Sequence, residues 1–372
     1  MRVLMITKAL VVGAYQKKAE ELARLPGVEL TVAVPPLWKE GRHRIQLERT
    51  FVQGYDLRVE PMALNGNFHL HYYPGLGRLI REVRPQILHI DEEPYNLATF
   101  LAMRLAKQTG TSALFFTWQN IYRRMPPPFS LFERYNFATA RWALAGSEGA
   151  RDVLLKKGFN RPISVIPQFG VDPALYSPDG PVVAASAGDP RPLAIGYVGR
   201  MIPAKGLAVL LRAAYGLRGN WHLTFVGEGP YKDALRKTAA VCGITRKVSF
   251  IPYVKSEEVP AHLRGFDVLV LPSQTTRNWK EQFGRVLVEA MACGVPIIGS
   301  DSGEIPHVIG DAGLIFREGN AEDLSQLLGR MMHEPELRAD LARRGRERVL
   351  QDYSQERIAQ QTYEVYCNMQ RP

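Results

Sequence analysis

The chain has 372 residues, of which 46% are hydrophobic and 23% are charged. This composition is typical of a folded globular protein and excludes a disordered, collagen-like or coiled-coil chain. One hydrophobic core rarely grows beyond roughly 250 to 300 residues, so we expect two domains. Lysine and arginine exceed aspartate and glutamate by 47 − 37 = 10, which favours a polyanionic partner: a nucleic acid, an anionic membrane surface or a phosphorylated ligand.

Cysteine usage and hydropathy indicate a cytoplasmic chain. Its three cysteines, Cys242, Cys293 and Cys367, are widely spaced and include no C-x-x-C pair. The apolar run at the N-terminus is shorter than a secretory signal requires, so we interpret it as a first strand. No apolar run reaches the roughly 18 residues that a membrane-spanning helix needs. Peripheral attachment to the inner face of a membrane stays open.

The first half of the chain alternates short β-rich runs with longer amphipathic stretches. This rhythm is typical of a parallel sheet covered by helices. The predicted strands are residues 3–7, 29–34, 86–90, 113–116 and 142–145, and the predicted helices include 14–25, 76–83 and 94–109.

The same pattern begins again after a break rich in proline, glycine and small residues at 167–192. The predicted strands of the second half are 193–198, 222–226, 248–251, 268–271 and 295–299, followed by helices at 321–332, 335–350 and 354–369. We therefore predict two Rossmann-like, doubly wound α/β domains: residues 1–170 and 191–353, with a linker at 171–190. The apolar last helix, within 354–372, is expected to pack back on the first domain.

The densest motif lies at residues 281–296. Glu281 and Gly284 precede a short predicted helix, Glu289 lies inside it, and a Gly-Val-Pro sequence ends it. Because Gly284 has no Cβ, backbone N–H groups at this helix N-terminus can approach an anion, which the helix dipole also favours. The motif predicts a phosphate-binding site, with two carboxylates 289 − 281 = 8 residues apart that reach successive parts of one extended ligand.

The two glutamates at this spacing are followed by the sequence Ala-x-Ala-x-Gly-x-Pro. This motif closely resembles that of the retaining glycosyltransferases of the GT-B fold, family 4. The resemblance continues in Gly199-Arg200-Met201-Ile202-Pro203-Ala204-Lys205-Gly206, just after a predicted strand, and in Ser302-Gly303-Glu304-Ile305-Pro306. It covers most of the C-terminal half and, more loosely, the N-terminal strand, loop and helix. It implies two domains flanking a cleft, and transfer of a sugar from a UDP- or GDP-sugar to a glycan, lipid-linked or small-molecule acceptor with retention of configuration.

The resemblance also implies roles for individual residues. Arg200 and Lys205 match the basic pair that neutralises the donor diphosphate, where charge develops in the transition state. Glu281 matches the glutamate that contacts the donor sugar, and Glu289 matches the one that binds the ribose. Further donor-binding positions are Gly13, Gly199, Tyr253, Val254, Phe283, Gly284 and Arg285, with Tyr253 and Val254 next to the base. The chain contains no Asp-x-Asp sequence, so we expect neither a catalytic metal nor a cofactor.

The first half departs from the family at the end of the predicted strand 86–90. His89 is kept, but Asp91 stands where the family commonly has its active-site histidine. Asp91, Glu92 or Glu93 would then replace that histidine near the anomeric carbon, or else the three acids cap the helix that follows. His89 is interpreted as a packed strand residue. Trp118, Gln119 and Asn120 follow the next strand and are candidate acceptor contacts, although core packing is an equal alternative for Trp118.

Residues 68–84 and 121–129 mix aromatic and basic side chains in a way that suits an anionic bilayer surface. The alternative for the first segment is an ordinary amphipathic helix with its apolar side on the sheet. Two other functions are alternatives: a sugar-nucleotide epimerase of the same architecture and, less favoured, a basic nucleic-acid-binding protein. The basic residues are dispersed rather than gathered with stacking aromatics, so no nucleic acid partner is expected.

Overall fold

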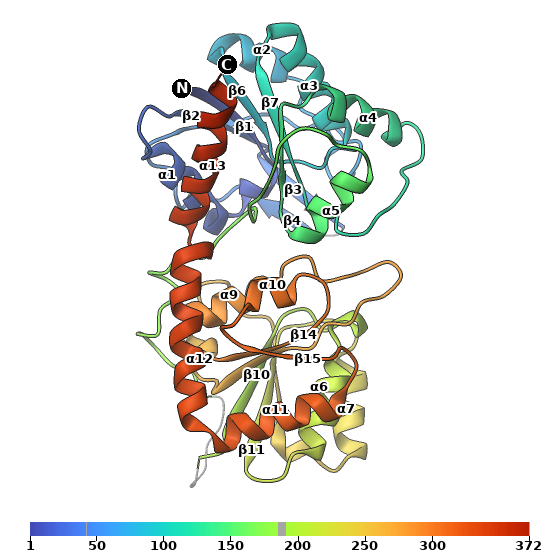
Figure 1. Cartoon of the computed structure of the whole chain (residues 1–372), viewed down its shortest axis with the longest axis vertical. Helices are drawn as coiled ribbons and strands as arrows, with labels where there is room; N and C mark the ends of the chain where they lie inside the picture. Colours follow the sequence, from blue (N-terminus) through green and yellow to red (C-terminus); the bar gives the residue numbers. More distant parts are fainter. Residues whose placement is uncertain (42, 185–190, 372) are drawn as a thin grey trace. The chain divides into compact units, whose positions relative to one another are not determined.

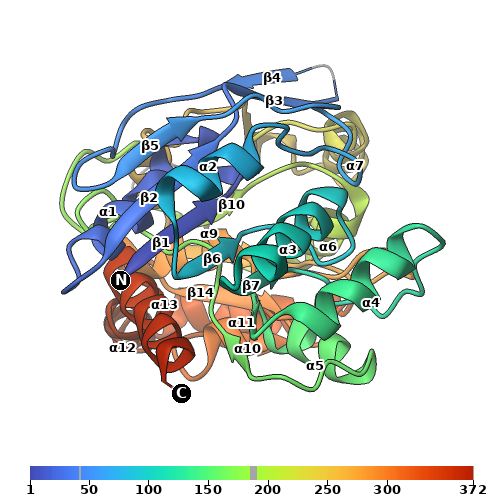
Figure 2. The same ribbon diagram turned by 90° about the horizontal axis from the view of Figure 1, so that it is seen from above.

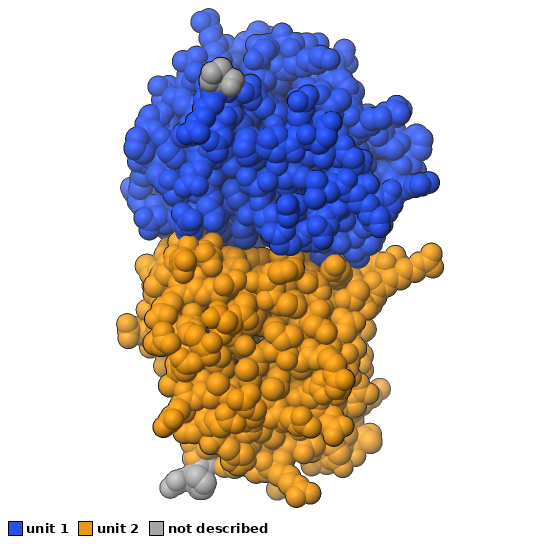
Figure 3. All heavy atoms as spheres, viewed as in Figure 1, with its two compact units in different colours: residues 1–170, 355–372 blue, residues 171–354 orange. Residues whose placement is uncertain are grey.

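The computed structural model describes residues 1–41, 43–184 and 191–371. The chain divides into two compact units (Figures 1 and 3). Unit 1 consists of Met1–Gly170 with Gln355–Pro372, and unit 2 consists of Val171–Ser354. The described part of the expected linker, 171–184, groups with unit 2, whereas its remaining residues, 185–190, lie outside the described ranges.

Unit 1 is built on a parallel sheet with the strand order β5-β2-β1-β6-β7-β8-β9. Its strands are β1 (Arg2–Ile6), β2 (Glu29–Val34), β5 (Asp56–Val59), β6 (Ile87–Ile90), β7 (Ser112–Thr117), β8 (Trp142–Ala145) and β9 (Ile163–Val165). A separate antiparallel hairpin joins β3 (Leu37–Glu40) to β4 (His43–Gln46). The doubly wound order places the carboxyl ends of β1 and β6 side by side, which is where ligands bind in such sheets.

Helices cover both faces of the sheet (Figure 2), and alternating side chains of the strands supply two separate cores, one on each face. From β1, Leu4 and Ile6 pack with the helices on one face, and Val3 and Met5 pack with those on the other. The first face carries α2 (Leu76–Val83), α3 (Leu97–Thr109), α4 (Phe129–Thr139) and α5 (Glu148–Lys156), and the second carries α1 (Lys17–Ala23) and α13 (Gln355–Gln370). Two 3₁₀ turns, η1 (Ala9–Val11) and η2 (Gly13–Gln16), lead from β1 into α1.

Helix α2 forms the C-terminal part of the segment 68–84, one of the two proposed for a bilayer surface. Its apolar residues Leu76, Leu79 and Ile80 are buried in the same core as Leu4 and Ile6. The hydrophobic face of α2 therefore covers the sheet, as the alternative interpretation has it, and is not available to lipid. None of the helices in the described ranges is long and apolar enough to cross a membrane.

Helix α13 adds a distant part of the sequence to unit 1. It packs against α1, and the hydroxyl of Tyr366 lies 2.6 Å from Nδ1 of the buried His89 in β6. Burial, followed by the nearby charge of Lys18, holds the pKa of His89 well below its ordinary value. His89 is thus a packed, neutral strand residue.

Replacing Tyr366 with phenylalanine tests this contact. The variant leaves Nδ1 of His89 buried without its partner, so we expect the free energy of unfolding to fall by about 1–3 kcal/mol. Urea denaturation of the full chain measures the loss. Tyr363→Phe is a control on the same helix, because its hydroxyl bonds the carbonyl of Pro26 at an exposed position. An equal effect of both changes would contradict the special role of Tyr366.

Unit 2 contains a second parallel sheet with the order β12-β11-β10-β13-β14-β15. The strands are β10 (Leu193–Val198), β11 (Trp221–Val226), β12 (Val248–Ile251), β13 (Val268–Leu271), β14 (Ile297–Ser300) and β15 (Leu314–Phe316). Its helices are α6 (Leu207–Gly216), α7 (Lys232–Val241), α8 (Val259–Leu263), α9 (Arg285–Ala292), α10 (Ile305–Ile309), α11 (Ala321–His333) and α12 (Pro335–Arg348), with 3₁₀ turns η3 (Pro203–Lys205) and η4 (Thr245–Lys247) and a π-helical stretch η5 (Val349–Tyr353) after α12.

Arginines of α12 donate hydrogen bonds to backbone carbonyls of the surrounding loops and helix ends of unit 2. Arg346 donates hydrogen bonds to the carbonyls of Tyr176 and Ala292, at 2.7 and 2.6 Å. Arg344 donates to the carbonyl of Asp311, and Arg348 to that of Val308. These guanidinium groups satisfy backbone acceptors at loop and helix ends. Part of the excess positive charge therefore serves the fold of unit 2.

Candidate functional site

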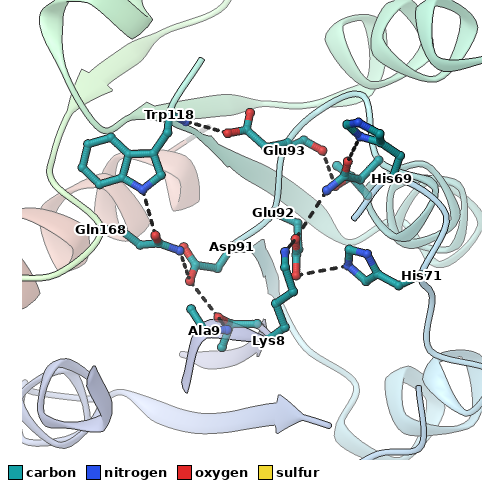
Figure 4. Close-up of polar contacts among 12 residues, drawn as sticks. Lys8, Ala9, His69, His71, Asp91, Glu92, Glu93, Trp118 and Gln168 are labelled. Carbon is teal, nitrogen blue, oxygen red and sulfur yellow. Dashed lines mark hydrogen bonds and ion pairs between the residues drawn. The ribbon is translucent and has the colours of Figure 1, made fainter. Parts of the chain in front are cut away.

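In unit 1, polar side chains gather where adjacent strands end (Figure 4). Thr7 and Lys8 follow β1, the acids 91–93 follow β6, Trp118 follows β7, and Gln168 comes three residues after β9. Four sequence segments therefore meet at the carboxyl edge of one sheet, because parallel strands place these ends together. We call Lys8, Asp91, Glu92, Glu93, Trp118 and Gln168 the unit 1 cluster.

Asp91 is nearly buried and held from two sides. Its Oδ2 accepts a 2.8 Å hydrogen bond from the hydroxyl of Thr7 and a 2.9 Å bond from the amide of Gln168. Burial raises the pKa of Asp91, and the nearby Lys18 together with the two hydrogen bonds opposes that rise. Its other oxygen, Oδ1, is buried with no hydrogen-bond partner among the described residues. Asp91 therefore keeps one oxygen unused at the position where the family commonly has histidine.

Glu92 forms the most strongly paired part of the cluster. Its carboxylate is ion-paired with Lys8 and lies 3.4 Å from Nε2 of His71. Lys8 also lies over the rings of Trp38 and Phe68, 5.4 and 5.0 Å from their centroids. Burial alone would raise the pKa of Glu92, but Lys8 and His71 outweigh it and lower that pKa to about 2. Glu92 therefore stays charged and positions Lys8.

Glu93 holds the loop that follows β7. One of its oxygens accepts a hydrogen bond from the backbone N–H of Trp118 at 2.8 Å, and the other accepts the hydroxyl of Thr117 at 2.6 Å. The indole N–H of Trp118 in turn donates to Gln168 at 2.9 Å. Burial raises the pKa of Glu93 to about 7 despite these bonds. Glu93 fixes the candidate acceptor residues rather than merely capping the next helix.

The pKa of Glu93 predicts a pH dependence of stability. A carboxyl whose folded-state pKa is raised stabilises the fold fully below its unfolded value, here 4.5, and that contribution is lost as pH rises through about 7. We expect the wild-type chain to lose roughly 2–3 kcal/mol of unfolding free energy relative to Glu93→Gln between pH 4.5 and pH 8. Urea titrations of both proteins at several pH values measure this difference. A constant difference across that range would contradict the assignment.

Three further predicted residues belong to unit 1. Gln119 accepts a 2.7 Å hydrogen bond from Lys157, and Asn120 is buried. The backbone N–H of Gly13 donates to the carboxylate of Glu48 at 2.6 Å, and a Cβ at Gly13 would lie 2.1 Å from the hydroxyl oxygen of Thr50. That amide is thus occupied by a carboxylate of its own unit, although we had expected it to approach donor phosphates.

In unit 2, Lys205 of the motif 199–206 and Glu281 of the motif 281–296 lie next to each other. The ammonium of Lys205, at the end of η3, lies 2.6 Å from Oε2 of Glu281, which also accepts a 2.6 Å bond from Ser273. Lys205 is 5.2 Å from the ring centroid of Trp279. Glu281 is buried, and Gly303, from the loop after β14, lies so close that a Cβ there would be 2.2 Å from the Glu281 carbonyl oxygen. The two predicted residues therefore form one preorganised ion pair.

Glu289 forms a second charged group in α9. One of its oxygens lies 2.8 Å from Nε of Arg285, one helical turn earlier, and 3.3 Å from the hydroxyl of Tyr176. Burial raises the pKa of Tyr176 above its usual range, so this hydroxyl acts as a neutral donor to Glu289. Arg285 and Tyr176 hold the carboxylate in one orientation.

The remaining predicted donor residues lie around these two groups. Gly284 caps the N-terminus of α9 in the left-handed conformation, with a φ of 79° that favours glycine. Phe283 is buried with its ring against Tyr353. Gly199 and Arg200 follow β10; the Arg200 side chain is exposed and forms no ion pair with a described residue. Tyr253 is exposed and Val254 half-buried after β12.

Several polar residues of these clusters were not identified from the sequence. His71 was placed in the proposed membrane segment and Gln168 in the break between domains, whereas Ser273, Trp279 and Tyr176 were not singled out. Gln168 and Ser273 each follow the end of a strand by a few residues. The rule that ligands bind beyond the carboxyl ends of parallel strands would have found both, had β9 been recognised.

Two family models match the sequence. "Glycosyl transferases group 1" matches residues 184–348, and "Glycosyltransferase Family 4" matches residues 17–175. The first range contains Arg200, Lys205, Glu281 and Glu289, and the second contains the acids 91–93 and Trp118.

Curated relatives match over about half of the chain. A GDP-mannose-dependent alpha-(1-6)-phosphatidylinositol monomannoside mannosyltransferase of Mycolicibacterium smegmatis is 31% identical over 196 residues, covering 50% of this chain and 51% of the relative. A D-inositol 3-phosphate glycosyltransferase of Salinispora tropica is 30% identical over 190 residues, covering 47% and 38%. An N-acetyl-alpha-D-glucosaminyl L-malate synthase of Bacillus anthracis is 33% identical over 151 residues, covering 40% and 38%. The matches thus span about half of these relatives or less.

Solved structures show the same fold over nearly the whole chain. The protein Alr3699/HepE of Anabaena, crystallised in complex with UDP, has a TM-score of 0.75 at 15% identity, covering 99% of this chain and all of that one. The lipopolysaccharide outer core galactosyltransferase WaaB in its apo form has a TM-score of 0.69 at 16% identity, covering 99% of this chain and all of that one. The two parallel-sheet units are therefore those of the GT-B fold.

Proposed function

Because the chain belongs to the family 4 glycosyltransferases of the GT-B fold, we propose that it transfers a hexose from a nucleotide sugar to an acceptor hydroxyl. The observation that carries the proposal is the Lys205–Glu281 ion pair, at 2.6 Å, inside the range that the group 1 model matches. Neither matched family model describes an epimerase or a nucleic-acid-binding protein, so the two alternatives receive no support from them.

Unit 2 would bind the donor. Lys205 and the exposed Arg200 supply cations for the diphosphate, and Gly284 opens the N-terminus of α9 toward it. Glu281 would accept hydroxyl groups of the sugar, and Glu289, held by Arg285 and Tyr176, would accept those of the ribose. Carboxylates suit both roles because each accepts two or more hydrogen bonds from neighbouring hydroxyls. A UDP- or GDP-sugar fits the chemistry of this set.

The reaction would break the bond between the anomeric carbon and the phosphate oxygen and form a bond from that carbon to the acceptor oxygen. The proton of the acceptor hydroxyl would pass to the departing phosphate oxygen on the same face, which retains configuration. Negative charge grows on the diphosphate during this step, so Lys205 and Arg200 would stabilise the transition state more than the ground state. Such cations take the place of a metal ion in our proposal.

Unit 1 would bind the acceptor. Oδ1 of Asp91 is buried and has no described partner, so it would reach an acceptor hydroxyl only after a local rearrangement on binding. The exposed part of Phe68 beside Lys8 offers a face for a sugar or polyol ring. Glu93 and Gln168 would position Trp118 for the same purpose. Hydroxyl-rich acceptors, including lipid-linked ones, match this polar and aromatic surface.

Thermal-shift measurements with a panel of UDP-, GDP- and ADP-sugars test the donor assignment. A ligand that binds only the folded state raises the melting temperature by mass action. We expect one nucleotide class to stabilise the chain and Glu289→Ala to abolish that shift. Stabilisation by none of the sugars, or an unchanged shift in Glu289→Ala, would overturn the donor site.

Product analysis tests the remaining parts of the proposal. With the donor identified, incubation with polyol and lipid-linked acceptors should yield a glycoside whose anomeric proton coupling in NMR matches that of the donor. Activity should persist in EDTA. An inverted product would overturn retention, and loss of activity in EDTA that added Mg²⁺ restores would overturn metal independence, without affecting the donor site.

A further inference from the structure

The opposite edge of the unit 1 sheet, at the amino ends of β8 and β9, carries a surface hollow of about 500 Å³. Its lining includes Arg141, which precedes β8, Arg161, which precedes β9, and Arg371, which follows α13. Thr139, Trp142 and Asn368 complete its polar and aromatic wall. The hollow is therefore built from three distant parts of the sequence and is separate from the unit 1 cluster at the carboxyl edge.

Among the described residues, no acidic side chain pairs with the three arginines. No ion pair formed within the described ranges includes Arg141, Arg161 or Arg371. A second hollow of about 340 Å³ shares Thr139 and Arg141 and adds Lys107 to the rim. No aspartate or glutamate occurs among the described residues that line either hollow. Like charges gathered without acids repel one another, so a bound anion would stabilise this arrangement.

The hollow is also preorganised. The backbone N–H of Arg141 donates to Ala113 at 2.8 Å, and its guanidinium donates to the carbonyl of Arg371 at 2.7 Å. This contact holds the arginine at the rim and leaves further N–H groups of the guanidinium for a ligand. The indole N–H of Trp142 donates to Ser164 at 3.0 Å, which fixes its ring in the wall. A rigid wall with forked donors matches the geometry of phosphate oxygens.

We propose that the hollow formed by Arg141, Arg161 and Arg371 is a binding site for a phosphate-bearing ligand. A volume of about 500 Å³ accommodates a phosphorylated small molecule or the headgroup of a phospholipid. Both sources offer the same chemistry to the arginines: a phosphate for the guanidinium groups, with neighbouring polar atoms toward Thr139 and Asn368. The site is independent of the transferase activity proposed above.

Titration calorimetry with pyrophosphate at constant ionic strength tests the site. The measurement uses the full chain carrying both Arg200→Ala and Lys205→Ala, which removes the two cations proposed for the donor diphosphate. We expect saturable binding that Arg161→Gln and, separately, Arg371→Gln each weaken at least about fivefold. Arg151→Gln is the matched control, because Arg151 lies on α5 outside the lining and pairs with Glu148. Binding should also change the fluorescence of Trp142, and Trp142→Phe should remove that change.

Vesicle sedimentation separates the two sources of phosphate. If the natural ligand is a lipid headgroup, phosphatidylglycerol vesicles should bind the chain, phosphatidylcholine vesicles should not, and Arg161→Gln should release it. If the ligand is a soluble phosphate compound, pyrophosphate should bind as described above. Binding of the chain to phosphatidylglycerol vesicles should then be the same with and without Arg161→Gln. Either result supports the site. Binding of both probes that is unaffected by Arg161→Gln and Arg371→Gln, or binding of neither, would overturn it.

Discussion

Replacing Lys205 with alanine should reduce sugar transfer by about 10²- to 10³-fold, as expected when one charged donor to a developing anion is removed. The loss has two causes. The departing diphosphate no longer faces the ammonium, and Glu281, which lies 2.6 Å from that ammonium in the wild type, keeps an uncompensated negative charge beside it. Initial rates at saturating and at low donor concentration measure the effect on kcat and on kcat/KM.

The double variant Lys205→Ala/Glu281→Gln separates the two causes. The double variant removes the uncompensated negative charge of Glu281, so donor affinity should recover in part while kcat stays low. Lys237→Ala, an exposed lysine of α7 in the same unit, is the matched control and should behave like the wild type. Transfer by Lys205→Ala at close to the wild-type rate would contradict the role of this lysine.

Replacing Lys8 with methionine should destabilise the chain by about 3–5 kcal/mol at pH 7, because it leaves Glu92 buried and without its main counter-ion. In the wild type, the side chain of Glu92 is 0% exposed and its pKa is about 2. Without Lys8, burial would raise that pKa. The deficit relative to the wild type should therefore shrink as pH falls toward 4 and the variant's Glu92 takes up a proton. Urea denaturation at a series of pH values measures it.

The double variant Lys8→Met/Glu92→Gln should recover most of this stability, since it buries no charge. Lys39→Met changes an exposed lysine of the hairpin and should cost little. A deficit in Lys8→Met that is independent of pH, or that persists undiminished in the double variant, would show that packing against Trp38 and Phe68 matters more than the charge.

Regular, well-buried elements were predictable from the sequence. Strands β1, β2 and β6 of unit 1 and β10, β11, β13 and β14 of unit 2 coincide closely with the expected apolar runs because they are covered on both faces. Strand β12 was also expected, although it lies at a sheet edge and is half-buried. Strands β5 and β9 and the β3–β4 hairpin were missed. They lie at sheet edges or outside the main sheet and carry charged or half-exposed residues, so neither an apolar run nor strict alternation marks them.

The site could be predicted in part, for a similar reason. In unit 2, Glu281 and Glu289 lie in one dense local motif and Lys205 in a second family-like motif, so the sequence alone predicts all three as donor-binding residues. The partners of Asp91 were not, because Thr7 and Gln168 are 84 and 77 residues away along the chain. Only the pairing of β1 with β6, and the position of β9 at the sheet edge, brings these segments together. Sequence proximity carries no information about such contacts.

Helix α13 completes unit 1 with residues that follow all of unit 2 in the chain. During synthesis, which proceeds from the N-terminus, every residue of unit 2 leaves the ribosome before Tyr366 does. Unit 2 is contiguous and can fold as soon as it emerges, whereas the face of the unit 1 sheet that carries His89 must wait for α13. Until then, the apolar side chains of α1 and β1 on that face lack their cover. Unit 1 of a nascent chain therefore depends on α13, and chaperones have their longest opportunity to bind at this unit, most of which is made first.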